Sequence, residues 1–203
     1  MSKEGYAMHM PSPNTVAPVK GLYQPDEFKD NCGFGLIAHM QGDASHDLVK
    51  TAIHSLSCMT HRGGIAADGK TGDGCGLLLA MPKAFFRAEA KKLSDITLSE
   101  IFAVGTVFLN LDPAIAAHSK QVLAKEIESE GLKVLAWRVI PTNVDALGSI
   151  ALQSMPAFEQ IIVNCPMGVT EVEFNRKLFL ARRRAEQQLA QDTSFYVTTL
   201  CST

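Results

Sequence analysis

The chain has 203 residues, of which 46% are hydrophobic and 20% charged, and its formal net charge is −2 at pH 7. Such a composition is typical of a globular protein with one sizeable core, and it does not favour binding to nucleic acid or to a membrane surface. No stretch reaches the roughly 18 apolar residues that a membrane-spanning helix requires. The cysteines number five, are widely spaced and follow no export signal, which indicates reduced thiols in a cytoplasmic protein.

Residues 1–31 form a leader that contains Pro11, Pro13, Pro18 and Pro25 and has no continuous apolar segment. This pattern is not that of a secretory signal. Two interpretations of the leader stay open, a disordered tail and a removable propeptide. In both, the ordered domain begins at Cys32 and runs to residue 203.

The first half of the domain predicts a strand, a helix, a glycine-rich loop, a second strand and a second helix. The strand spans 32–40 and is followed by a turn at 41–43. Ser45 caps a helix that reaches about residue 61, where two glycines follow. The glycine-rich loop spans 68–76, a short apolar strand spans 77–81, and Pro82 starts a helix that ends near residue 92.

The second half alternates strands with helices. Strands are expected over 102–109, 132–140, 158–164 and 194–201, and the segment 142–156 is ambiguous between a short helix and a loop. Asp112 caps a helix that stops at Gly131, and Thr170 opens a capping-box helix. The last strand is apolar and alternates poorly, so we expect it to have neighbours on both sides. The pattern is mixed α/β and resembles a chain cut short.

Cys32 is the first candidate for chemistry, because it opens an apolar run between Asn31 and the glycines at 33 and 35. A thiol of pKa near 8.5 needs a base to act as a nucleophile at neutral pH. Cleavage of the Asn31–Cys32 bond would free an α-amine of pKa roughly 7.7–8.0, and that amine could take the proton from its own thiol. The alternative is a small buried cysteine that fills a strand.

The segment from Gly64 to Thr71, G-I-A-A-D-G-K-T, fits the pattern of a phosphate-binding P-loop. That mechanism requires a strand before the loop and a helix after it, with an aspartate such as Asp112 for magnesium. Here a helix precedes the loop and further glycines follow it. The nucleotide-binding interpretation is therefore the weaker one.

Three further patterns have a structural and a functional interpretation. His54, Cys58 and His61 share one helical stripe and, with Cys75, could bind zinc, although a polar helix face is the simpler interpretation. The run 182–184 of three arginines is flanked by glutamates, as on a solvated helix face. Arg62 either complements a helix C-terminus or stabilises negative charge near the nucleophile.

Three blocks together resemble a known family: D-N-C-G-F-G-L-I-A-H at 30–39, H-R-G at 61–63 and A-D-G-K-T-G-D-G-C-G-L-L-L at 67–79. They are similar to the N-terminal glutaminase domain of the bacterial glutamate synthase large (alpha) subunit, a class II glutamine amidotransferase. The likeness continues through F-L-N (108–110), P-T-N (141–143) and L-F-L-A-R-R-R (178–184). It covers nearly the whole chain.

This resemblance implies an α+β fold of the N-terminal-nucleophile hydrolase type, an αββα sandwich, here incomplete at its C-terminus. It implies a propeptide at 1–31, Cys32 as the nucleophile with its α-amine as base, and Arg62 as a supporting residue. The substrate is glutamine, hydrolysed through a cysteine thioester to glutamate and ammonia. The full-length enzyme uses that ammonia to aminate 2-oxoglutarate with FMN, an iron–sulfur cluster and an electron-delivering small subunit, while this segment binds no cofactor.

The chain departs from the family in length. The family's arginine for the α-carboxylate of glutamine, its Asn-Gly oxyanion hole and its aspartate for the α-amine all lie further along, in the remainder of the large subunit. Loss of one oxyanion-hole donor typically costs about 10²–10³ in rate, so we expect little activity from this chain alone. The alternative from another class is a non-catalytic α/β interaction module.

Overall fold

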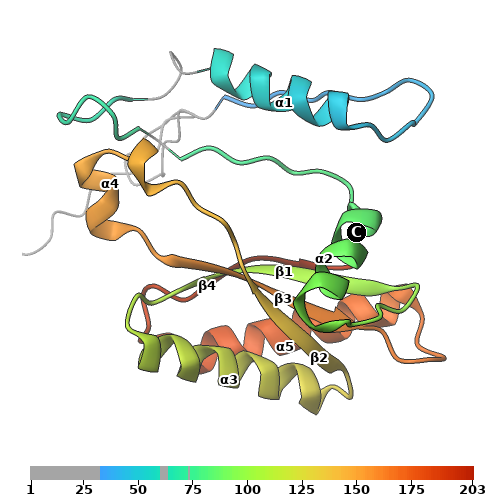
Figure 1. The fold of residues 1–203 in the computed structure, drawn as a ribbon. Helices are drawn as coiled ribbons and strands as arrows, with labels where there is room; N and C mark the ends of the chain where they lie inside the picture. Colours follow the sequence, from blue (N-terminus) through green and yellow to red (C-terminus); the bar gives the residue numbers. More distant parts are fainter. Residues whose placement is uncertain (1–32, 60–63, 73) are drawn as a thin grey trace, which may run out of the picture.

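The computed structural model describes residues 33–59, 64–72 and 74–203. A four-stranded antiparallel sheet of order β2-β3-β1-β4 forms the centre of the described fold (Figure 1). Its strands are β1 Phe102–Leu109, β2 Lys133–Val139, β3 Ala157–Asn164 and β4 Tyr196–Cys201. Because helices and an antiparallel sheet are combined in this way, the predicted α+β class is confirmed.

The central strand β1 pairs along its whole length with β3 and along most of its length with β4. Gly105 lies in the middle of β1, opposite Ile161 of β3 and Leu200 of β4. A Cβ atom at this position would lie 2.8 Å from Leu200 Cδ1, 2.9 Å from Ile161 Cγ2 and 3.0 Å from the carbonyl oxygen of Thr199. The neighbouring side chains therefore fill the space that a larger residue at Gly105 would need.

Helices α3 (Pro113–Ser129) and α5 (Glu171–Gln188) cover one face of the sheet. Asp112 caps α3 by accepting hydrogen bonds from the amides of Ala114 and Ile115, and Thr170 caps α5 by accepting one from Glu173. The apolar faces of the two helices bury the largest core cluster against alternate residues of the strands. Its fully buried members include Val107, Leu109, Leu123, Ile127, Ile161, Val163, Phe174, Leu178 and Val197.

Helix α2 (Lys83–Ser94) packs on the opposite face of the sheet, where Phe86 and Ala90 meet Phe102, Val104 and Ile162. An ion pair holds this helix to the edge strand β2. Arg138 donates to Glu89 at 3.0 Å and to Gln160 of β3 at 2.9 Å, and Lys92 donates to the same Glu89 at 2.8 Å. The two side chains of the Arg138–Glu89 pair are only 13% and 19% exposed, so this pair is better protected from solvent than an ordinary surface pair.

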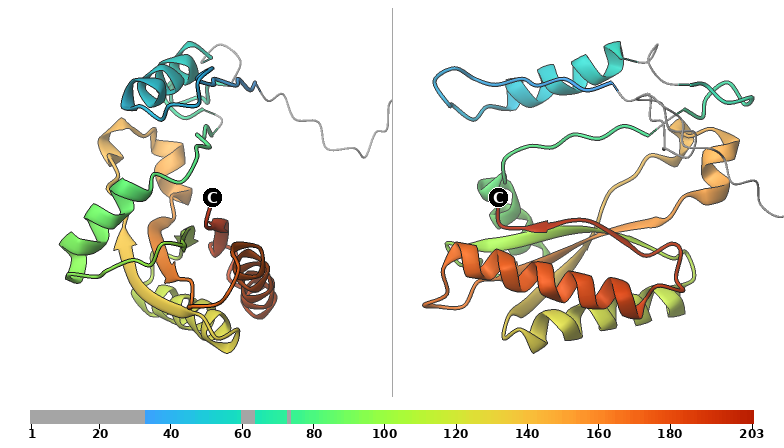
Figure 2. Two further views of the ribbon diagram at one scale, coloured as in Figure 1. Left: turned by 90° about the vertical axis from the view of Figure 1, so that its right-hand side faces the viewer. Right: turned by 180° about the vertical axis from the view of Figure 1, so that it is seen from behind.

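The segments that the structure describes before residue 82, namely 33–59, 64–72 and 74–81, lie on the side of the sheet away from α3 and α5 (Figure 2). Helix α1 (His46–Cys58) begins at Ser45, whose side chain accepts a hydrogen bond from the amide of Leu48. Between β2 and β3 the chain forms a short 3₁₀ helix, η2 (Val144–Ala146), and the six-residue helix α4 (Ser149–Ser154). Among the helices that the structure describes, none combines the length and the apolarity needed to cross a bilayer.

Most predicted elements agree with the structure, but two predicted strands are wrong. Residues 33–40 and 77–81 contain no strand. Phe34, Leu36 and Leu78 are 94%, 91% and 89% exposed. An apolar run predicts burial, but a strand also requires a neighbouring strand that pairs with it. Among the described residues, no strand pairs with either segment.

The environment of β4 also differs from the prediction. The strand forms as expected, but it is an edge strand that pairs with β1 alone within the described part of the chain. Its end is held instead by the buried Ser202, which exchanges hydrogen bonds with Asn175 and donates to Glu171 of α5.

Gly105→Ala tests the close packing around β1. We expect it to lower the free energy of unfolding by about 1–2 kcal/mol, because overpacking of a filled core outweighs the gain from replacing glycine. Chemical denaturation of the full chain measures this difference. Gly76→Ala is the matched control, since its Cβ meets no heavy atom within 4 Å. Equal stabilities of the two variants would show that the space above Gly105 is not filled.

Candidate functional site

The two residues predicted to carry chemistry, Cys32 and Arg62, lie outside the described residues, as does Asp73 of the glycine-rich loop. The structure does describe the segments that follow them in the chain. Residues 33–40 continue from Cys32 as an extended segment, which turns at Gly42 with a φ of +76°. Residues 64–72 begin two positions after Arg62.

Residues 64–72 form a small hairpin. Ile65 pairs with Gly72 in an isolated antiparallel bridge, and the Ala66 amide donates to the Thr71 carbonyl at 2.7 Å. Gly69 occupies the left-handed region with a φ of +71°, which favours glycine at the tip of the turn. The hairpin therefore brings its two ends, Gly64 and Gly72, side by side.

Asp68 and Thr71 join this hairpin to the N-terminus of α4. One carboxylate oxygen of Asp68 accepts from the amides of Lys70 (3.1 Å) and Thr71 (2.8 Å). The other accepts from the Thr71 hydroxyl at 2.6 Å and from the Ile150 amide at 3.1 Å. Thr71 Oγ1 in turn accepts from the Ala151 amide at 3.1 Å. We call these contacts the Asp68–Thr71 latch.

The latch favours the ionised form of the Asp68 carboxyl group. The Thr71 hydroxyl, and then the amides of Thr71 and Ile150, lower the pKa of Asp68 well below its usual range, because each donates a hydrogen bond to the charged form. The sequence predicted a glycine-rich loop over 68–76, but the partner of Asp68 at α4 lies 82 residues further along and no local pattern points to it.

The same contacts contradict the P-loop interpretation. A helix does not follow Thr71, and residues 74–81 form neither helix nor strand. The amides of Lys70 and Thr71, which a P-loop directs at phosphate, donate to Asp68 instead. Asp112, the candidate magnesium ligand, caps α3.

Comparison with known proteins decides the family. The profile described as "Glutamine amidotransferases class-II" matches residues 32–203, which is most of the chain. The chain belongs to the class II glutamine amidotransferases. The matched region begins at Cys32 and includes both the latch and the sheet.

The relatives of this amidotransferase are long glutamate synthases. The chain is 36% identical over 191 residues to the glutamate synthase (NADPH) large chain of Bacillus subtilis (strain 168), covering 93% of this chain and 12% of that protein. It is 37% identical over 188 residues to ferredoxin-dependent glutamate synthase 2 of Synechocystis sp., covering 91% and 12%. For glutamate synthase (NADH) of Saccharomyces cerevisiae the identity is 34% over 207 residues, covering 97% and 10%. The chain thus spans only 10–12% of the length of these relatives.

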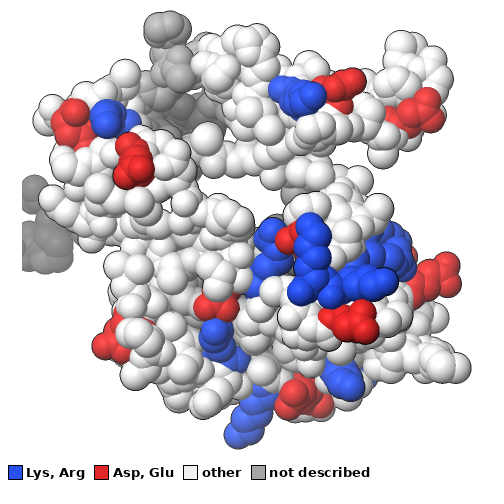
Figure 3. Space-filling model, viewed as in Figure 1, with Lys and Arg blue, Asp and Glu red and all other residues white. Residues whose placement is uncertain are grey.

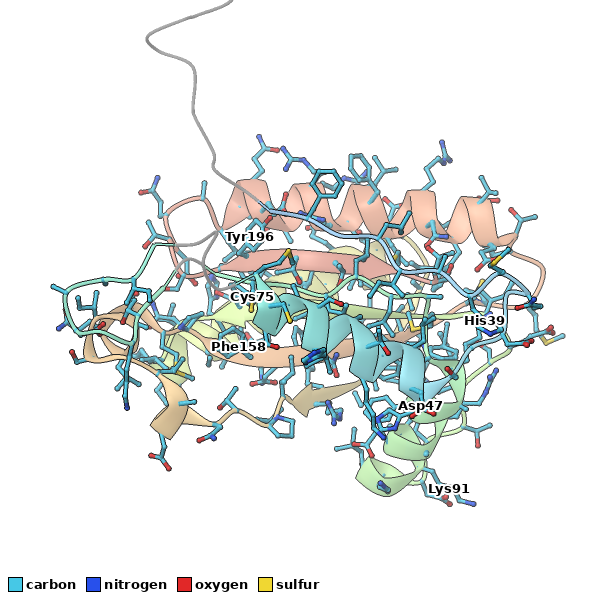
Figure 4. All side chains as sticks on the ribbon, turned by 90° about the horizontal axis from the view of Figure 1, so that it is seen from above. His39, Asp47, Cys75, Lys91, Phe158 and Tyr196 are labelled. Carbon is cyan, nitrogen blue, oxygen red and sulfur yellow. The ribbon has the colours of Figure 1, made fainter. Side chains whose placement is uncertain are left out.

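The cysteines of the amidotransferase segment differ in exposure. Cys58 is exposed on α1 and its sulfur lies 3.8 Å from His54 Nε2, while Cys75 is exposed on the segment beneath α1 (Figure 4). His61, the third member of the predicted stripe, lies outside the described residues. Within the described ranges no group of three or more His, Cys, Asp or Glu side chains could hold a metal ion.

Some of the charged side chains that the structure describes form ion pairs, among them those of Lys120, Arg138 and the arginines of α5. On the face shown in Figure 3, basic side chains gather around α2 with acidic ones among them. On α5, Arg182 and Arg183 both contact Glu186, and Arg184 contacts Glu130. The three arginines thus behave as a solvated, ion-paired helix face, as their flanking glutamates predicted.

The thiols should react in the order of their exposure. Cys165 is 8% exposed, and burial, followed by the nearby Glu171, raises the pKa of its thiol. Near pH 7.5 we expect a maleimide to modify Cys58 and Cys75 in the folded chain, and Cys165 at least about 100-fold more slowly. Peptide mass spectrometry with and without denaturant measures the rates. Fast modification of Cys165 in the folded chain would contradict this burial.

Proposed function

We propose that residues 32–203 are the N-terminal part of the glutaminase domain of a glutamate synthase, with Cys32 as its nucleophile. The observation that carries this proposal is the family match, whose first residue is Cys32. The same boundary supports residues 1–31 as a propeptide. Similarity to three glutamate synthases that differ in their named electron donors supports glutamate synthesis as the setting of the domain.

The chemistry follows from a freed N-terminus. Hydrolysis of the Asn31–Cys32 bond gives Cys32 an α-amine of pKa roughly 7.7–8.0, which accepts the thiol proton. The thiolate attacks the side-chain amide carbon of glutamine, and the amide nitrogen leaves as ammonia after it takes up that proton. Water then hydrolyses the γ-glutamyl thioester, which releases glutamate and restores the thiol. Arg62 supports the negative charge that develops near the nucleophile.

Further polypeptide of the same domain completes the site and the fold. That polypeptide supplies a second sheet, which packs on the exposed segments 33–40 and 77–81 and gives the four-layer αββα sandwich of the family. Their exposed apolar side chains support this, since Phe34, Leu36 and Leu78 have no packing partner among the described residues. Figure 3 shows an opening between the segment that leads to α2 and the first sheet.

In the full-length protein the released ammonia serves the reductive amination of 2-oxoglutarate. FMN and an iron–sulfur cluster carry the electrons for that step, and a small subunit delivers them. Neither group belongs to this segment in our proposal. The described cysteines do not fit cluster ligation, since Cys58, Cys75, Cys165 and Cys201 form no metal-binding group with other candidate ligands.

A chimera tests the function in a complete protein. Residues 1–203 of this chain replace the matching segment of the Bacillus subtilis large chain, and ammonia release from glutamine is measured. We expect the chimera to retain glutaminase activity and Cys32→Ala to lower it at least about 10³-fold, because the thioester path is lost. Cys58→Ala is the control and should leave the rate unchanged.

Glutamate synthesis from added ammonia reports whether the chimera is folded. A chimera that uses ammonia normally but releases none from glutamine would contradict the glutaminase assignment. That result would favour the alternative from another class, a non-catalytic interaction module.

A further inference from the structure

The Asp68–Thr71 latch binds two parts of the chain that are far apart in sequence. Asp68 receives the Ile150 amide and Thr71 receives the Ala151 amide, and Ser149 Oγ lies 3.5 Å from Asp68 Oδ2. Both amides belong to the first turn of α4, where helical amides lack partners within their own helix. Gly148, the N-cap residue of α4, offers no side chain to fill this role. The hairpin therefore provides the cap that the local sequence of α4 omits.

Gly148 is itself part of this arrangement. A Cβ atom at Gly148 would collide with the Asp68 carboxylate, the Thr71 hydroxyl and the Thr71 amide. Its backbone has a φ of −77° and a ψ of 158°, which any residue adopts without strain. Glycine is therefore required at position 148 because a side chain there would clash with the hairpin, and not because of the backbone conformation.

One end of the hairpin lies close in the chain to Arg62, the supporting residue of the proposed glutaminase site. Gly64 follows Arg62 after one intervening residue, and Gly72 precedes the loop that leads to Cys75. The bridge between Ile65 and Gly72 holds the two described ends of the hairpin side by side. The contacts of Asp68 and Thr71 with the amides of α4 therefore tie the hairpin 64–72 to α4, which leads directly into β3 of the sheet.

We propose that Asp68 and Thr71 are positioning residues of the glutaminase site, which hold the hairpin 64–72 against α4, with Gly148 as the residue that permits the contact. This inference rests on the proposed function. The carboxylate occupies the end of α4, so the D-G-K-T sequence serves as a cap for a distant helix. Asp68 and Thr71 touch no substrate in this arrangement and act only through the hairpin.

Amide hydrogen exchange of the full chain tests the latch directly. Removal of a hydrogen bond to a charged group should raise the exchange rates of Ile150 and Ala151 about 10–100-fold in Asp68→Asn, Thr71→Val and Gly148→Ala. The amides of β1 and β3 should keep their parental rates. Thr71→Ser retains the hydroxyl and should restore slow exchange. Asp145→Asn removes the same charge from an exposed position beside α4 and should change nothing.

The pH dependence follows from the pKa of Asp68. Since this pKa lies below its ordinary value in the folded state, the latch contributes stability above the unfolded pKa of about 3.9 and loses it as the pH falls through the folded value. Protection factors of Ile150 and Ala151 should therefore stay constant from about pH 8 to about pH 5.

The same substitutions in the Bacillus chimera measure the effect on the site. We expect Asp68→Asn and Thr71→Val to lower kcat for glutamine about 10-fold or more with ammonia-dependent synthesis unchanged, and Thr71→Ser to rescue kcat. A chimera without glutaminase activity contradicts the proposed function and leaves exchange to report on the latch alone. The positioning role is overturned if the chimera is active and its Asp68→Asn variant keeps the same kcat. It is also overturned if the Asp68→Asn variant of the full chain keeps slow exchange at Ile150 and Ala151.

Discussion

The hydrogen bonds that β1 makes on both of its edges are the constraint on which the described fold depends. With β3 on one side and β4 on the other, β1 brings together strands that lie up to about a hundred residues apart. One face of this sheet is closed by α3 and α5, and α2 covers part of the other. Position 105 accommodates glycine because the side chains of Ile161 and Leu200 occupy the space that a Cβ atom would need. Of the residues that the structure describes before position 81, none belongs to the two core clusters that form on this sheet.

The N-terminal segments 33–40, 64–72 and 77–81 differ in how they contact the rest of the chain. The segment that follows Cys32 and the segment 77–81 expose their apolar side chains, whereas the hairpin between them is fixed by the Asp68–Thr71 latch. Exposed apolar segments on either side of the hairpin in the chain are what one part of a larger domain would show. The match to only 10–12% of the long glutamate synthases agrees with that interpretation.

The sequence predicted the elements whose signals are local. The bounds of β1 agreed to the residue, and the caps at Ser45, Asp112 and Thr170 each accept the predicted amide hydrogen bonds, because capping depends on residues within one turn. The strands predicted over 32–40 and 77–81 failed, because hydrophobicity does not reveal whether a pairing partner is present. The latch was missed for a related reason, since Asp68 and Ile150 are 82 residues apart. The P-loop pattern matched by residue type alone, because such a match does not show whether a strand precedes the loop and a helix follows it.

The central claim is that the α-amine of Cys32 is freed and activates the thiol of the same residue. Intact mass measurement combined with N-terminal sequencing of the protein purified from the cells that make it tests this most directly. The account predicts a chain that begins at Cys32, shorter by the 31 residues of the leader. An active protein that retains Met1 and an uncut Asn31–Cys32 bond would contradict it.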